Sequence, residues 1–148
     1  MTDPAGPSTA DALHAIEQIK QLKARYFRLL DTKRWDEWGD VFTPGCVMEV
    51  PEADMVSQGR DEIVRGVSGA LEGVRSVHHG HMPEIELTGP DTAQGIWAMF
   101  DYLEWPASDG NTSGIKGYGH YYEEYARDGG QWRISRLRLE RIRIDPLR

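Results

Sequence analysis

The sequence predicts one α+β domain, with helices in its first half and a curved, mostly antiparallel sheet in its second half. Apolar residues recur at three- and four-residue steps up to about residue 71, which indicates helices. From residue 74 onward, long strand-like runs follow one another, separated by the turn-forming segments TGPD, PASDGNTS and DGG. No strand–helix–strand alternation interrupts this order, which argues for α+β rather than a doubly wound parallel sheet. The length of 148 residues suits one core, and we place the domain at residues 11–148, after a flexible tail at residues 1–10.

Helices are expected at residues 11–30, 34–42 and 59–71. The first is amphipathic, with these apolar residues on one face: Leu13, Ile16, Ile19, Leu22, Tyr26, Phe27, Leu29 and Leu30. The second carries two tryptophans and ends before Pro44 and Gly45. A short strand follows at residues 46–50. The third helix starts after Gly59, although Gly66 and Gly69 lower its helical propensity.

Four long strands are expected to form an antiparallel meander at residues 74–87, 92–105, 114–127 and 131–144. The strand at 92–105 carries apolar side chains on both faces, so we expect helices to cover one face and a partner subunit the other. This pattern predicts a homodimer built on the sheet. In the last strand the apolar phase changes twice, which predicts two β-bulges. Bulges bend a sheet, and a bent sheet can enclose a cavity.

Composition narrows the classes of function. The net charge of −7 argues against general binding to nucleic acids, which needs an excess of Lys and Arg. No window of about 18 apolar residues could span a bilayer, and the first residues lack a secretory signal, so we expect a cytoplasmic protein without membrane contact. A single cysteine, Cys46, cannot form an internal disulfide or a cysteine-based zinc site. We interpret it as a small buried strand residue.

Asp31 is the first polar residue that could carry chemistry, because it directly follows an apolar run that ends in Leu29 and Leu30. One interpretation is structural: the side chain ends this helix or caps the next one. The other is a carboxylate that faces a pocket and orients a histidine or stabilises its charge. Tyr26 lies five residues earlier, and its hydroxyl could reach the same pocket.

Three histidines begin the strand at 74–87, within the segment SVHHGHMPEIEL. Alternation along the strand places His79 and His81 on one face and His78 on the other. Imidazole suits proton transfer near neutral pH, although a structural role stays open for each of the three. His-x-His on a strand can also chelate a metal, but a convincing third ligand is missing from the sequence. We therefore expect no metal.

His120 lies in the segment GYGHYYEEYARDGG, which is rich in tyrosine. Aromatic side chains with polar ends suit the wall of a pocket for ring-shaped ligands. The alternative is aromatic core packing with His120 bonded to a tyrosine. Gly117 and Gly119 lie within a strand and no helix follows, so the segment is not a phosphate-binding loop. No Gly-x-Ser-x-Gly elbow is present, which disfavours covalent acyl transfer.

In combination, these elements resemble the SnoaL-like family of the nuclear transport factor 2-like superfamily from about residue 12 to residue 145. The resembling marks are the helix ending at Tyr26 to Asp31, the segment Trp35 to Phe42 leading to Val47 to Val50, Gly59-Arg60-Asp61-Glu62-Ile63, His79, and Gly119-His120-Tyr121 leading to Gly130-Gln131-Trp132-Arg133-Ile134. The resemblance implies a cone-shaped α+β barrel, with the helices in the concave face of the sheet and often with dimerisation through the sheet.

The resemblance also implies a site. Dehydratases of the scytalone and bile-acid types and a dehydrochlorinase use an Asp–His pair without a metal or an organic cofactor. Asp31 matches the family's helix carboxylate, His79 its strand histidine and Tyr26 a pocket tyrosine, while His120 matches a further site position. The superfamily also contains cyclases, isomerases, epoxide hydrolases, dioxygenase β-subunits and binding modules, so the fold alone does not choose the reaction.

We therefore expect a lyase or isomerase that needs no cofactor and acts on a small, cyclic, hydroxylated and mostly apolar compound, steroid-like or polyketide-like. His79 would remove a proton beside a carbonyl while Asp31 holds its imidazole within hydrogen-bond reach. Tyr26 or His120 would polarise the carbonyl or the departing hydroxyl. The expected pocket residues are Trp35, Met48, Met82, Trp97, Met99, Tyr102, Tyr118 and Tyr122. The alternative is a small-ligand-binding or accessory subunit with the same fold and no catalysis.

Overall fold

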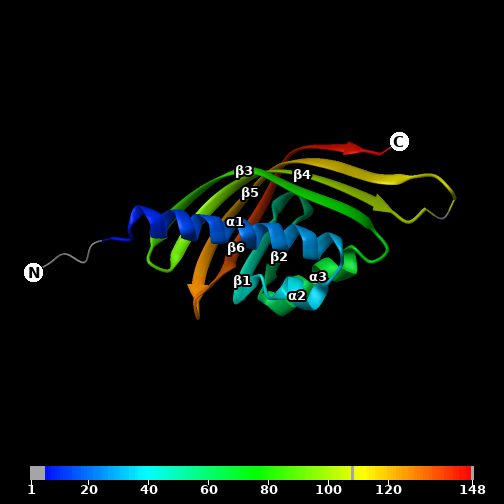
Figure 1. Ribbon diagram of the computed structural model, residues 1–148. Coiled ribbons are helices and arrows are strands. Elements are labelled where there is room, and N and C mark those ends of the chain that lie inside the picture. The colour runs from blue at the N-terminus through cyan, green and yellow to red at the C-terminus, as the bar shows by residue number, and fades with distance from the viewer. Residues whose placement is uncertain (1–5, 108, 148) are drawn as a thin grey trace, which may run out of the picture.

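The computed structural model describes residues 6–107 and 109–147 and confirms the α+β class. The elements in chain order are α1 (Thr9–Asp31), α2 (Trp35–Gly39), β1 (Phe42–Val50), the short 3-10 helix η1 (Pro51–Ala53), β2 (Met55–Gln58), α3 (Arg60–Ala70), β3 (Arg75–Gly89), β4 (Thr92–Trp105), β5 (Ser113–Asp128) and β6 (Gln131–Pro146). Helix α1 lies across the concave side of a curved sheet, and α2 and α3 lie near the C-terminal end of α1 (Figure 1). No helix among the described residues is long and apolar enough to cross a membrane.

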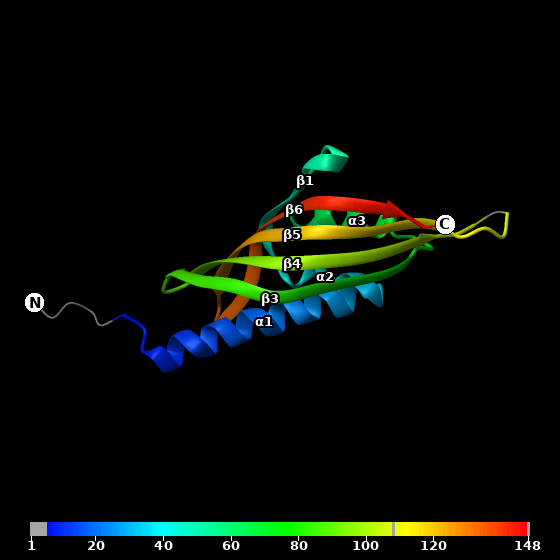
Figure 2. The same ribbon diagram turned by 90° about the horizontal axis from the view of Figure 1, so that it is seen from above.

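The six strands form one sheet in the order β2-β1-β6-β5-β4-β3. Strands β3 to β6 are consecutive antiparallel neighbours, as the meander predicted. Figure 2 shows the four long strands side by side, with α1 running along them. Strand β1 adds to this meander by pairing parallel with β6, and β2 pairs antiparallel with β1 at the edge of the sheet. The sheet is therefore mixed, with one parallel pair.

Two expected boundaries were wrong. The second helix ends at Gly39, and Phe42 already belongs to β1, so the predicted helix at 34–42 is shorter than expected. The chain leaves the helix because Phe42 pairs with Ile134 of β6, which places its ring in the core. Helix α1 begins at Thr9, two residues inside the expected tail, since the Ser8 Oγ accepts a hydrogen bond from the Asp11 N–H at 3.1 Å. Residues 1–5 of that tail lie outside the described part.

Both predicted bulges of the last strand are confirmed. The pairing of β5 with β6 shifts between Tyr118 and Gly119, and again between Glu124 and Tyr125. The shifts leave one extra β6 residue each, at Ile142 and Ser135. The shift at Ser135 keeps Leu137 and Leu139 on the buried face with Ile134, whereas Ile142 and Ile144 are exposed.

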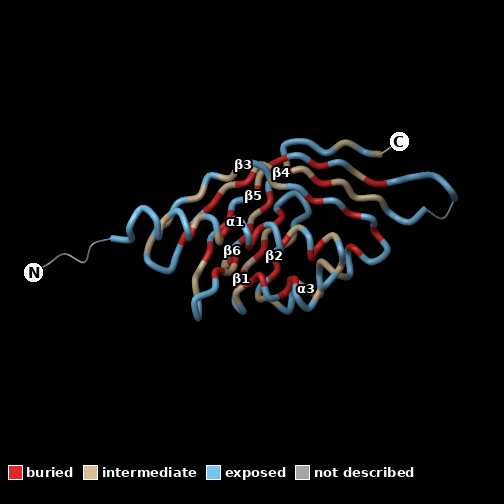
Figure 3. Tube along the Cα trace, viewed as in Figure 1, coloured by how far each residue is buried: buried red, intermediate tan, exposed pale blue. Residues whose placement is uncertain are grey.

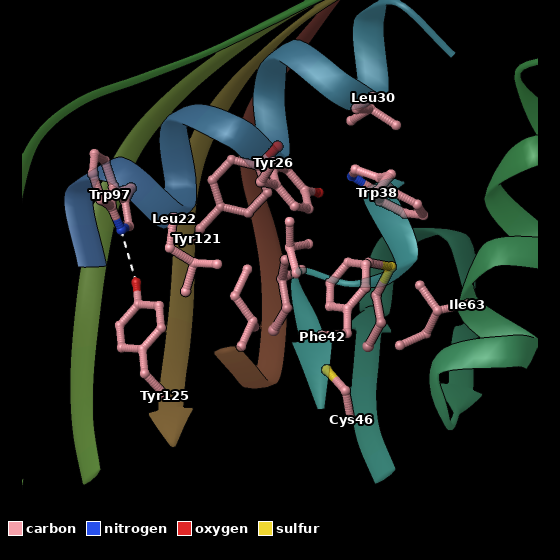
Figure 4. Packing of buried hydrophobic residues seen from close by; sticks show 14 of the residues in the cluster. Leu22, Tyr26, Leu30, Trp38, Phe42, Cys46, Ile63, Trp97, Tyr121 and Tyr125 are labelled. Carbon is pink, nitrogen blue, oxygen red and sulfur yellow. Dashed lines mark hydrogen bonds between the residues drawn. The ribbon is translucent and has the colours of Figure 1, made fainter. Parts of the chain in front are cut away.

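The core lies between α1 and the inner face of the sheet, where the buried residues gather (Figure 3). Aromatic side chains dominate it: the Tyr26 ring meets the rings of Trp38, Phe42 and Tyr121 at centroid distances of 5.6 to 6.0 Å. Figure 4 shows this cluster, together with Cys46 at the inner face of β1. The interpretation of Cys46 as a small buried strand residue is confirmed, since it is 0% exposed.

Candidate functional site

Asp31 is the last residue of α1, and the local backbone fixes its place. Lys33 takes a left-handed backbone conformation with φ 58°, and the Arg34 N–H donates back to the Leu29 carbonyl at 2.9 Å, which closes the helix. The side chain of Asp31 does not cap α2, whose N-cap residue, Arg34, makes no side-chain cap. The side chain points instead toward the start of β3. The backbone alone ends α1, so the Asp31 carboxylate is free to contact β3.

Three donors from β3 hold the Asp31 carboxylate. Its Oδ2 accepts a hydrogen bond from the His78 backbone N–H at 2.8 Å. Its Oδ1 accepts one from the Ser76 hydroxyl at 3.0 Å and faces the His78 Nδ1 at 2.7 Å. The His78 side chain is 9% exposed and the Asp31 side chain 23%, so the pair is mostly buried and still open to solvent on the Asp31 side. A carboxylate bonded to Nδ1 fixes the ring and leaves Nε2 as the nitrogen that can take a proton.

A second carboxylate approaches the far side of the imidazole. Asp101 of β4 is opposite His78 in the strand pairing, and its Oδ2 lies 4.0 Å from the His78 Nε2. Asp101 is fully buried, and its charge is balanced by Arg141 of β6, whose Nη2 donates to Oδ2 at 2.5 Å. Arg141 also reaches Glu52 of η1 at 3.4 Å. The site therefore places His78 between two carboxylates, each held by its own donors.

Gly117 of β5 leaves the space that the Asp101 and Arg141 side chains occupy. A Cβ at this position would lie 2.1 Å from the Asp101 Oδ1 and 2.7 Å from the Arg141 Nε. Both atoms are buried and have no hydrogen-bond partner among the described residues. A side chain at position 117 would have to displace them. The glycine that the sequence shows within a strand is thus explained by a close approach of two charged side chains.

A second buried polar cluster lies two turns of α1 before Asp31. The Lys23 Nζ is 3.1 Å from the Glu123 Oε2, and both side chains are 0% exposed. The ammonium lies over the rings of Tyr26 and Tyr121, at 3.6 and 3.8 Å from their centroids. Burial lowers the pKa of Lys23 to about 8 and raises the pKa of Glu123, although each stabilises the charge of the other.

Tyr26 and Tyr121 connect the two clusters. Burial raises the pKa of Tyr26 well above its ordinary value, and the charges of Tyr121, Glu123 and Asp31 add to this effect. Burial also raises the pKa of Tyr121, to which the charge of Asp101 contributes. Both phenols therefore keep their protons near neutral pH and can act as hydrogen-bond donors.

Of the four expected catalytic residues, the structure brings Asp31 and Tyr26 to this region and separates His79 and His120 from it. The prediction that Asp31 faces His79 is wrong, because the partner of Asp31 is His78. His79 lies on the outer face of the sheet, with its ring 6.1 Å from that of Phe100. His120 lies on the same outer face, opposite Ala98 in the strand pairing.

The expected pocket residues divide between the two faces in the same way. Met48, Trp97 and Met99 point inward and are at most 6% exposed. Trp35 is half-buried and packs edge-on against Trp38. The prediction was wrong for four others, which have the opposite strand parity or lie in a bulge and so face outward: Met82, Tyr102, Tyr118 and Tyr122. Met82 is 92% exposed, in a bulge of β3.

The space under α1 is filled by side chains. Trp97, Tyr121 and Tyr125 are buried there, and the Trp97 Nε1 donates to the Tyr125 hydroxyl at 2.9 Å (Figure 4). A hollow of about 540 Å³ is lined by residues of β3 to β6, including Ile96 and Tyr122, and another of about 620 Å³ lies beside α1 against Trp132. Neither is lined by Asp31 or His78. Solvent reaches the Asp31–His78 pair on the Asp31 side, where the side chain is 23% exposed.

Sequence reasoning missed His78, Ser76, Asp101 and Arg141. Asp101 had a usable signal, because it shares strand parity with the buried residues Trp97 and Met99. A lone carboxylate on an apolar face needs a partner, and this points to an arginine or histidine nearby. Arg141 had a similar signal, because it continues the alternation of the buried residues Leu137 and Leu139 on β6. Within the described residues, no three His, Cys, Asp or Glu side chains are grouped so that they could hold a metal ion.

Comparisons with known proteins agree with this architecture. The family model described as a SnoaL-like domain matches residues 11–138. The probable cyclase FGR4 of Gibberella zeae is 25% identical over 134 residues, which cover 84% of this chain and 89% of the relative.

Two solved structures share the fold. A protein assigned as a scytalone dehydratase from Novosphingobium aromaticivorans has a TM-score of 0.84 at 19% identity and covers 95% of this chain and 93% of its own. The hexachlorocyclohexane dehydrochlorinase LinA-type3 of Novosphingobium barchaimii has a TM-score of 0.81 at 21% identity, with 95% and 94% covered.

Proposed function

Because the chain belongs to the family of SnoaL-like domains, we propose that it is a lyase or isomerase that works without a cofactor on a small, cyclic, hydroxylated and mostly apolar compound, steroid-like or polyketide-like. The observation that carries the proposal is the contact of 2.7 Å between Asp31 and the His78 Nδ1, at a position still open to solvent. An imidazole held in this way by a carboxylate is suited to general acid–base catalysis.

In the proposed step, the His78 Nε2 removes a proton from a carbon next to a carbonyl. The electron pair of the broken C–H bond forms a carbon–carbon double bond, and the carbonyl oxygen gains negative charge. In a dehydration the electrons return as the carbon–oxygen bond of the hydroxyl breaks, and the proton on His78 joins the departing oxygen to give water. In an isomerisation the same proton returns to a different carbon. His78 therefore acts first as a base and then as an acid.

Electrostatics support this use of His78. Once Nε2 is protonated, the imidazolium lies between Asp31 and Asp101, at 2.7 and 4.0 Å from their nearest oxygens. Opposite charges at these distances stabilise the protonated ring. Arg141, whose Nη2 donates to the Asp101 Oδ2, balances the negative charge of Asp101. Tyr26, which keeps its phenolic proton, and Arg141 are the donors that we assign to the charge developing on the substrate oxygen.

The relatives support the coarser part of the proposal. A dehydratase and a dehydrochlorinase both catalyse eliminations, and a cyclase catalyses ring formation. At 19% and 21% identity, the solved structures establish the shared fold. Since the same fold also serves proteins without catalysis, the Asp31–His78 contact is what favours an enzyme here.

The test is a turnover screen of the full chain with hydroxylated steroid ketones and aromatic polyketides, read by mass spectrometry for loss of water and by chromatography for isomers. His78→Ala should lower kcat/KM by about 10²- to 10⁴-fold, the usual contribution of a positioned acid or base. His79→Ala is the matched control, because it removes an outward imidazole from the neighbouring position, and it should leave turnover unchanged. Compounds that raise the melting temperature and are recovered unchanged would instead identify a binding protein.

A further inference from the structure

Asp31 occupies an unfavourable place for a carboxylate. As the last residue of α1 it lies at the helix C-terminus, where the partial charge of the helix is negative. The nearest basic residue of the last turn, Arg28, is exposed on the helix surface. The negative charge of Asp31 is therefore stabilised chiefly by the three donors from β3.

Ser76 stands out among these three donors. Its side chain is buried, 7% exposed, and its hydroxyl has one hydrogen bond in the described structure, to the Asp31 Oδ1. The same oxygen faces the His78 Nδ1. The backbone N–H of His78 takes the other oxygen, so the carboxylate is held from two directions and cannot rotate without losing a bond.

From this geometry we infer that Ser76 is a positioning residue, which fixes the plane of the Asp31 carboxylate and through it the direction of the His78 ring. The inference rests on the proposed function, because a fixed ring matters when Nε2 must meet a substrate proton. Ser76 touches neither the substrate nor the reacting nitrogen and acts only through Asp31. Its place two residues before His78 on one strand gives both side chains the same inward face.

The surroundings leave the imidazole no equivalent support. The groups that face it are Asp31 from α1, Asp101 from β4 with Arg141 of β6 behind it, and Ser76 through Asp31. If the hydroxyl of Ser76 is removed, Asp31 can turn toward solvent, to which it is already 23% exposed. The ring would then lose its fixed partner at Nδ1 and keep only the more distant carboxylate of Asp101, 4.0 Å from Nε2, so its orientation would be less firmly held.

The experiment compares Ser76→Ala, Ser76→Thr and Ser57→Ala in the full chain. Ser57 is the matched control, since it is also a strand serine and is also 7% exposed, on β2. The first readout needs no substrate: the solvent exchange rate of the His78 Nδ1 proton, measured by NMR with histidine labelled with ¹⁵N. Ser76→Ala should raise this rate about tenfold or more, the effect of losing one hydrogen bond to a charged group. Ser76→Thr keeps a hydroxyl and should restore the slow exchange.

The second readout is kinetic, on any substrate found by the screen. Ser76→Ala should lower kcat with little change in KM, and Ser57→Ala should change neither. The inference is overturned if the exchange rate in Ser76→Ala stays at the wild-type value, or if Ser57→Ala raises it equally. If the wild-type protein turns over no compound, the proposed function fails while the exchange measurement still decides the role of Ser76.

Discussion

Lys23 gives the most specific stability prediction, because its ammonium group is fully buried and the structure describes its contacts. In Lys23→Met the Glu123 carboxylate keeps only the hydroxyl of Tyr125, at 3.2 Å, and loses the ammonium at 3.1 Å. Removing one partner of a buried pair typically costs about 3–5 kcal/mol. The lost contacts with the faces of Tyr26 and Tyr121 act in the same direction.

This cost is a large part of the total stability of a domain, which is about 5–15 kcal/mol. For a chain of this length, each kcal/mol shifts the melting temperature by about 2–4 °C, so Lys23→Met should melt roughly 6–20 °C lower than the wild type. The double variant Lys23→Met/Glu123→Gln leaves no buried charge at these two positions and keeps an acceptor for Tyr125. It should recover at least about half of the loss, because the desolvation of both charges disappears together.

The assay is urea denaturation at pH 7, followed by tryptophan fluorescence, with the free energy of unfolding taken from the midpoint and slope. The single variants and the double variant form a cycle that isolates the coupling of Lys23 and Glu123. A loss below about 1 kcal/mol in Lys23→Met, or a double variant no more stable than Lys23→Met, would refute the reasoning.

Four further outcomes are expected. Burial lowers the pKa of Lys23 from 10.5 to about 8, so between these pH values the unfolded chain binds more protons than the folded chain. The stability of the wild type relative to Lys23→Met/Glu123→Gln should therefore rise from pH 8 to 10.5. A stability difference that falls over this range would contradict the prediction. Burial raises the pKa of Cys46 to about 12, so a thiol reagent at pH 8 should label it only on unfolding, and prompt labelling of the native protein would count against its burial. Gly117→Ala should displace Asp101 and destabilise the fold by about 1–3 kcal/mol, and a crystal structure with an unmoved carboxylate would disprove this. The homodimer through the outer sheet face stays a prediction: light scattering should give twice 16.8 kDa, Met82→Glu should lower that mass, and a wild-type monomer at micromolar concentration would end the idea.

The order of the elements could be predicted because it rests on periodicity, which each segment carries by itself. The three- and four-residue steps of α1 and the turn segments between the long strands both specify local structure. Strand β2 was missed because four residues are too short for a period, and its pairing with β1 comes from the tertiary structure. The parallel pairing of β1 with β6 was missed for the same reason, because it joins distant parts of the chain and depends on the tertiary structure.

The choice of the wrong histidine has a local cause in β3. Ile85 and Leu87 pack against the core, and simple alternation from them would turn His79 and His81 inward. The pairing with β4 shifts between His81 and Glu84, where Met82 takes φ 33°, and this extra residue reverses the phase. The inward residues before the shift are therefore Ser76 and His78. A single bulge, which no periodicity reveals, decided which imidazole meets Asp31.

The central claim, that Asp31 holds His78 with Nε2 free to take a proton, is tested most directly by the tautomer of the ring. NMR of the full chain labelled with ¹⁵N-histidine at pH 8 distinguishes a proton on Nδ1 from one on Nε2, with His78→Ala to assign the signal. The wild type should show the neutral ring protonated at Nδ1, and Asp31→Asn should lose this preference. A neutral wild-type ring protonated at Nε2 would contradict the account, because the nitrogen that we assign as the base would then already carry a proton.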